Sequence, residues 1–233
     1  MMAEAKAIDS SKILLVEGDA DRNLFTQLCK SLPFSPEIRV ASPRDLNPKS
    51  RDGKQAVLKQ TSILLKQFAD LETGSQRCLA VVIDADYKAE GGLGYQNTVE
   101  QFESIVAELG YLLVSDLSNN HGLIFLHSDG LSDLGLWVMP NNNSDGMLED
   151  WIKDCIHQDE KPLFTHAESI VEALNPKRFK PIHLSKAEVA TWLAWQEQPG
   201  HGLYLTVTGQ LLDANKPLYT DLIAWLKHIF EKV

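Results

Sequence analysis

The sequence has few cysteines, and they stand far apart. Only Cys29, Cys78 and Cys155 occur in 233 residues. An odd number without a Cys-x-x-Cys pair or a Cys/His cluster argues against both a disulfide framework and a zinc site. The seven histidines are scattered as well, without a His-x-x-x-His spacing that could bind a metal. Any metal chemistry must therefore come from carboxylates.

Long hydrophobic runs are also absent. No stretch of about 18 apolar residues occurs, so the sequence predicts no membrane span. Residues 1–11 are polar and charged and lack the apolar segment of a secretory signal. We therefore expect a cytoplasmic protein with a flexible N-terminus over residues 1–11.

Positive charge is scarce. The net charge is −10, which argues against a broad basic face that would bind nucleic acid by neutralising phosphates. It does not exclude a metal-dependent enzyme, because an acidic cluster attracts a cation and the cation meets the phosphate. Basic residues do gather in two groups, each typical of a solvated charged surface when taken alone. These groups are Lys49, Arg51, Lys54 and Lys59, and Lys177, Arg178 and Lys180.

An apolar run from Ile13 to Val16 ends in the carboxylate of Glu17. Four mostly branched apolar residues favour a strand that is buried on both faces, and Gly18 allows a sharp turn. Asp19 or Asp21 can cap the helix that follows. Ligand sites in open α/β sheets lie outside the carboxyl ends of strands, so Glu17 is a candidate site residue.

A second buried strand over residues 78–83 leads into Asp84-Ala85-Asp86. Apolar spacing predicts a helix over residues 54–71, and a helical crossover implies that the two strands are parallel. Their acidic ends then share one edge of the sheet. Strand residues two apart point to the same face, so Asp84 and Asp86 could bind one hard cation directly and another through water. Glu17 could transfer protons or complete a second metal site.

The remaining patterns predict an α/β fold with a mainly parallel central sheet flanked by helices. The core covers residues 12–157, and residues 158–233 form a mainly helical extension packed on it within one structural domain. Dinucleotide and phosphate-loop fingerprints are both absent. Further strands are predicted at 37–40, 123–127 and 134–139, and helices at 97–109, from about 147, and at 166–174, 185–196 and 218–232.

The two acidic motifs resemble those of the Toprim domain. Val16-Glu17-Gly18-x-x-Asp21 and Val82-Ile83-Asp84-Ala85-Asp86 are similar to the motifs of this metal-binding module of topoisomerases, bacterial-type primases and OLD-family nucleases. The resemblance implies a Toprim-like, Rossmann-like fold. It implies that Glu17 is a general acid/base, that Asp84 and Asp86 bind magnesium, and that Asp21 joins the metal site.

Residues 135–151 resemble a family of uncharacterised, mostly prokaryotic Toprim-like proteins related to the OLD branch. This resemblance implies that Glu149 is a further metal-site acid and that Lys186 stabilises the transition state. On the predicted helix, Glu149 flanks the apolar stripe whereas Asp150 points away from it. The plain alternatives are that acids in a first helical turn complement the helix dipole and that Lys186 is a surface lysine.

Together these patterns predict a phosphodiester-processing protein that uses Mg²⁺ or Mn²⁺, specifically a nuclease acting on DNA or RNA. The sequence shows no ATPase domain and no separate DNA-gripping domain. The alternative is therefore a non-catalytic Toprim-like module that binds metal or nucleotide and works with a separately encoded partner such as an ATPase. A phosphorylation switch of the receiver type, built on Asp84 or Asp86, is a third reading, but the chain is long for it.

Overall fold

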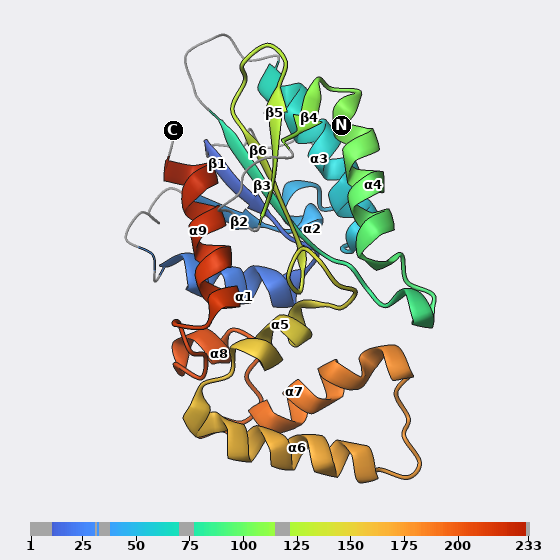
Figure 1. Ribbon diagram of the computed structural model, residues 1–233, viewed down its shortest axis with the longest axis vertical. Helices are drawn as coiled ribbons and strands as arrows, with labels where there is room; N and C mark the ends of the chain where they lie inside the picture. The colour runs from blue at the N-terminus through green and yellow to red at the C-terminus, as the bar shows by residue number, and fades with distance from the viewer. Residues whose placement is uncertain (1–10, 31, 33–37, 70–76, 115–121, 232–233) are drawn as a thin grey trace.

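A six-stranded sheet in the order β2-β1-β3-β6-β5-β4 forms the centre of the structure (Figure 1). The computed structural model describes residues 11–30, 32, 38–69, 77–114 and 122–231, so the predicted flexible N-terminus lies almost wholly outside the described residues. The strands are β1 (Lys12–Leu15), β2 (Ile38–Ala41), β3 (Cys78–Asp84), β4 (Tyr111–Leu113), β5 (Leu123–His127) and β6 (Leu134–Met139).

The sheet is mixed, which corrects the prediction that it is mainly parallel. β1 pairs in parallel with β2 and β3, and β3 pairs in parallel with β6, whereas β5 runs antiparallel to both β6 and β4. The physical reason lies in the connections. No helix separates β5 from β6, and strands joined by a short loop must pair antiparallel. β5 and β6 lie where the sequence predicts strands, whereas the three-residue β4 was not predicted.

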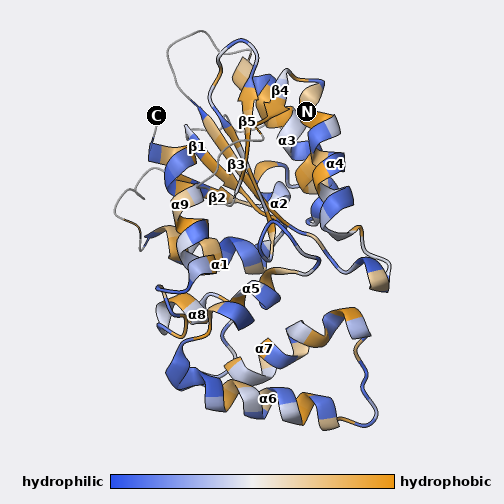
Figure 2. Ribbon diagram, viewed as in Figure 1, coloured by the Kyte–Doolittle hydropathy of each residue, from blue (hydrophilic) through white to orange (hydrophobic). Residues whose placement is uncertain are grey.

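Side chains of the central strands alternate strictly between two hydrophobic cores. Leu14 and Val16 of the β1 segment face one core, whereas Ile13 and Leu15 face the other. β3 alternates in the same way, because successive side chains of a strand point to opposite faces. Figure 2 shows the result as apolar strands enclosed by helices whose outer surfaces are hydrophilic. Both faces of the sheet are therefore covered.

Helices form a layer on each side of the sheet. α1 (Asp19–Lys30), α5 (Leu148–Cys155) and α9 (Pro217–Glu231) contribute to one core, and α3 (Lys54–Ala69) and α4 (Gly94–Ala107) to the other. The remaining helices are α2 (Pro43–Leu46), η2 (Lys88–Glu90), η3 (Gln158–Glu160), α6 (Lys161–Ala173), η4 (Pro181–His183), α7 (Leu184–Ala194) and α8 (Leu205–Thr208). Among the described residues, none of these helices is long and apolar enough to cross a membrane.

The C-terminal part is helical, as predicted, but its helices occupy two places. α6 and α7 pack against each other, and α7 also packs on α5. α9 instead returns to the sheet and contacts β3 and β6 (Figure 1). Gly135 in β6 allows this close approach, because a Cβ atom there would lie 2.8 Å from Ile229 Cγ1 and 2.9 Å from Trp225 Cζ2.

We predict that Gly135→Ala lowers the free energy of unfolding by about 1–3 kcal/mol, because the added methyl group overpacks the contact between β6 and α9. Chemical denaturation measures the effect. Gly202→Ala is the matched control, since its Cβ would meet only Tyr204 at an ordinary 3.7 Å, and it should change stability by less than about 0.5 kcal/mol. Equal effects of the two substitutions would contradict the packing described for α9.

Candidate functional site

The strand order reverses between β1 and β3. The chain passes from β1 through α1 to β2 on one side, and then crosses through α3 to β3 on the other side of β1. α1 and α3 belong to opposite cores, so the crossovers cover opposite faces. In open α/β sheets such a switch point leaves a crevice at the carboxyl ends of the strands, where ligands bind. Glu17 follows β1 and Asp84 ends β3 at this point.

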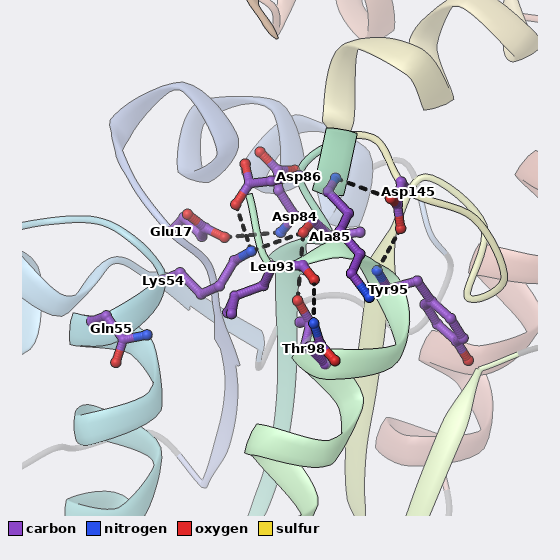
Figure 3. Close-up of polar contacts among 12 residues, drawn as sticks. Glu17, Lys54, Gln55, Asp84, Ala85, Asp86, Leu93, Tyr95, Thr98 and Asp145 are labelled. Atoms are coloured by element: carbon purple, nitrogen blue, oxygen red, sulfur yellow. Dashed lines mark hydrogen bonds and ion pairs between the residues drawn. The ribbon is translucent and has the colours of Figure 1, made fainter. Parts of the chain in front are cut away.

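Glu17 is held by the backbone of β3. The Asp84 N–H donates a hydrogen bond of 2.8 Å to Glu17 Oε1 (Figure 3). Burial raises the pKa of Glu17 to about 7, with further contributions from Asp21 and Asp86, although this hydrogen bond and the charge of Lys54 lower it. A carboxyl group that titrates near neutral pH suits proton transfer.

Asp84 links the end of β3 to the start of α5. Its Oδ1 accepts a hydrogen bond of 2.9 Å from the N–H of Leu148, the first residue of that helix. Burial raises the pKa of Asp84 well above its ordinary value, and the neighbouring carboxylates of Glu17, Asp21 and Glu149 raise it further. The helix N-terminus therefore compensates only part of the negative charge that is concentrated here.

The structure brings Asp21, Glu149 and Lys186 to the same place. Glu149 is only 8% exposed, and burial raises the pKa of both Asp21 and Glu149. Burial opposes the charge of Lys186, but the carboxylates around it outweigh that cost and raise its pKa. The charges of these three residues act on Asp84, and those of Asp21 and Lys186 also interact with the charge of Glu17. We call the side chains of Glu17, Asp21, Asp84, Glu149 and Lys186 the acidic site.

Asp86 has a different surrounding from the one that strand geometry predicted. β3 ends at Asp84, and Asp86 adopts a left-handed backbone conformation with φ of 61°. Lys54 Nζ donates to Asp86 Oδ2 at 2.6 Å and to the Ala85 carbonyl oxygen at 3.1 Å (Figure 3). The alternation of side chains along β3 therefore does not extend to Asp86. Its carboxylate is paired with Lys54 instead. Asp86 stays a predicted metal ligand, but Lys54 would have to release it.

A hydrogen-bond network missed by the sequence analysis positions Glu149 and Lys186. Tyr87 Oη donates to Asp150 at 2.5 Å, and Ser185 Oγ donates to the other oxygen of Asp150 at 2.6 Å. These bonds tie α5, α7 and the loop after β3 together, and Asp150 and Ser185 are the sequence neighbours of Glu149 and Lys186. The N3 position of Asp150 predicts only its capping bond to the Met147 N–H. No sequence signal identifies Tyr87 and Ser185 as the partners of Asp150, or Lys54 as the partner of Asp86.

The acidic site fits a cation that needs few protein ligands. Within the described ranges, no three His, Cys, Asp or Glu side chains are grouped closely enough to hold a metal ion by themselves. Magnesium commonly keeps several waters and uses one or two carboxylates together with substrate phosphates. Four carboxylates of raised pKa beside one lysine leave an excess of negative charge that such a cation would neutralise.

The fold and the site together define an α/β protein with a mixed sheet and an acidic site at its switch point. The chain belongs to the family described as "Protein of unknown function (DUF3226)", which matches residues 11–231. Comparisons with curated proteins and with solved structures found no match. The resemblance to Toprim domains therefore stays a prediction.

The pKa of Glu17 predicts how stability depends on pH. Its pKa is about 7 in the folded protein against an ordinary 4.5, so the folded state binds more protons between these values. The stabilisation is complete below about pH 4.5 and is lost as the pH rises through 7. In EDTA, Glu17→Gln should reduce this loss and be more stable than wild type at pH 8 by about 1–3 kcal/mol.

Denaturation midpoints at pH 5 and pH 8 measure this difference. Asp129→Asn, in the exposed loop between β5 and β6, removes one carboxylate far from the acidic site in sequence and should leave the pH dependence unchanged. A Glu17→Gln variant with the wild-type pH dependence would show that Glu17 ionises normally in the folded protein.

Proposed function

We propose that this protein is a Mg²⁺- or Mn²⁺-dependent phosphodiester-processing enzyme of the Toprim class, specifically a nuclease acting on DNA or RNA. One observation carries the proposal. The acidic site draws its side chains from five separate parts of the fold, which are the end of β1, α1, β3, α5 and α7. Chemistry of this kind needs acids to hold a cation, a group that moves protons and a fixed positive charge.

Each residue has a role that its surroundings support. Asp84 would hold the cation together with Asp21 or Glu149, and the cation would neutralise phosphate charge and make a bound water more acidic. Glu17, with a pKa near 7, is suited to exchanging a proton with the attacking or leaving oxygen. Lys186 keeps its positive charge beside the carboxylates and would offset charge that develops on the phosphate.

The destabilisation that comes from burying several carboxylates together indicates that the acidic site has a function. Burying like charges beside one another disfavours folding, and perturbed carboxylates of this kind gather at functional sites. Asp84 alone could be explained as the cap of α5, because it accepts the Leu148 N–H. First-turn positions suit Asp21 and Glu149 to their helix dipoles, but helix ends do not explain why Glu17 and Lys186 also act on Asp84.

A second candidate function is a non-catalytic module that binds metal or nucleotide and works with a separately encoded partner such as an ATPase. The ion pair between Lys54 and Asp86 favours it, because that pair occupies one of the carboxylates that catalysis with two metals would use. Metal binding is shared by the first candidate and the metal-binding form of the second, whereas cleavage belongs only to the first.

Calorimetry with Mn²⁺ tests the shared element. We expect wild-type protein to bind the cation and Asp84→Asn to weaken binding by at least about tenfold, because a ligand is lost. Asp129→Asn has the same charge change at an exposed position and should bind as wild type does. If the wild-type protein bound no Mn²⁺, the first candidate and the metal-binding form of the second would both fail.

Cleavage of labelled DNA and RNA oligonucleotides in Mn²⁺ separates the two candidates. Glu17→Gln should lower the rate by about 10²–10⁴-fold, because proton transfer is lost. Lys186→Met should lower it by about 10²–10³-fold, because one electrostatic contact to the phosphate is lost. Undiminished cutting by Glu17→Gln would refute the assigned site, and Mn²⁺ binding without any cutting would favour the non-catalytic module.

A further inference from the structure

The connection between α6 and α7 concentrates positive charge in an acidic protein. The chain carries 32 acidic and 22 basic residues, yet residues 173–187 contain four cations and no acid. Three of these cations, Lys177, Arg178 and Lys180, are exposed on residues 174–183, which we call the basic arm. None of the three forms an ion pair with another described residue.

The other basic group differs, because Lys54 is paired with Asp86 and acids lie near its remaining members in the chain. Around Lys49 and Arg51 the chain also carries Asp45 and Asp52, and Asp52 Oδ2 lies 3.7 Å from the Arg44 guanidinium. Positive charge there is balanced by nearby acids. Of the two basic groups, the basic arm is therefore the one whose segment holds no acid and whose cations remain available to an external anion.

The arm leads directly into the acidic site. It ends in η4, α7 starts at Leu184, and Lys186 lies in the first turn of α7 among the carboxylates. Ser185 fixes that turn to Asp150 of α5. In Figure 1 the α6–α7 pair lies below the sheet, and the arm closes the pair at the lower right. Cations of the arm and of Lys186 thus follow one another along a single stretch of chain that reaches the site.

A phosphodiester substrate needs such a stretch. Four carboxylates and a net charge of −10 repel a polyanion, so binding requires local cations that compensate. Phe179 lies between Arg178 and Lys180 and is partly exposed. Basic residues interleaved with an aromatic ring are typical of surfaces that bind single strands, where cations contact phosphates and the ring stacks on a base.

We propose that the basic arm binds single-stranded nucleic acid and holds the strand beside the acidic site. This inference rests on the proposed function, because it assumes that the acidic site acts on phosphodiesters. Lys177, Arg178 and Lys180 contact the phosphates, and Phe179 contacts a base. A single strand is favoured over a duplex because a duplex needs a broad basic face, which this acidic chain does not offer.

Fluorescence anisotropy with labelled DNA and RNA oligonucleotides of about 20 nucleotides tests the proposal. EDTA is present, so that no cleavage occurs. The triple variant Lys177→Ala/Arg178→Ala/Lys180→Ala should bind at least about tenfold more weakly, and the slope of log K against log salt should shrink by about 2. Phe179→Ala should weaken binding with an unchanged salt slope, because it removes stacking and leaves the phosphate contacts.

The matched control is Lys30→Ala/Lys59→Ala/Lys66→Ala, which removes three exposed lysines of α1 and α3. It should bind as wild type does, and thermal melting should confirm that both triple variants are folded. Equal affinity of the two triple variants would overturn the proposal, as would tighter binding of duplex than of single strands, or no binding at all.

The same experiment separates this inference from the proposed function. Asp84→Asn keeps the arm and removes one carboxylate that repels the polyanion, so in EDTA it should bind at least as tightly as wild type. Binding through the arm without any cutting in Mn²⁺ would support the arm and refute the nuclease. If the protein cuts the oligonucleotides but the arm substitutions leave its affinity for them unchanged, the nuclease is supported and the inference about the arm is overturned.

Discussion

The mutual repulsion of buried carboxylates is the constraint on which the rest of the structure depends. Glu17, Asp21 and Glu149 all raise the pKa of Asp84. Asp21 also raises the pKa values of Glu17 and Glu149. Backbone N–H groups of Asp84 and Leu148 offset part of this cost, and Lys54 and Lys186 contribute positive charge. Such charges stay together only if rigid elements hold them, because free side chains would move apart into water.

The scaffold provides that rigidity from two directions. Alternating apolar strands lock β1 and β3 between two cores, so the strand ends that carry Glu17 and Asp84 have little freedom. Asp150 binds Tyr87 and Ser185, which fixes α5 and α7 against the loop after β3. Packing therefore sets the strand side of the acidic site, and a polar network sets the helix side. We propose that the carboxylates held in this way attract a cation and that Lys186 attracts the phosphate.

Local patterns predicted the helices and strands of the fold better than the contacts between residues around the acidic site. The strands at 123–127 and 134–139 were predicted with their observed bounds, because apolar runs bounded by turn residues define strands locally. The stripe of Leu148, Trp151 and Ile152 also placed Glu149 inward, as observed. The partner of Asp86 was missed, since a left-handed residue just past a strand end leaves no trace in the apolar pattern. The antiparallel β4 was missed because three residues are too few to show alternation.

By itself, the sequence determined that two buried strands end in acid and lie on a common edge, because apolar periodicity and a helical crossover fix these features locally. It also determined the scarcity of positive charge and the concentration of cations over residues 173–187. Only the tertiary structure decided that Lys186, more than 160 residues from Glu17, lies in the same charged group, and that Lys54 pairs with Asp86. Contacts of this kind depend on how helices pack on the sheet, and the packing is set by shape and hydrogen bonds between segments that are remote in the chain.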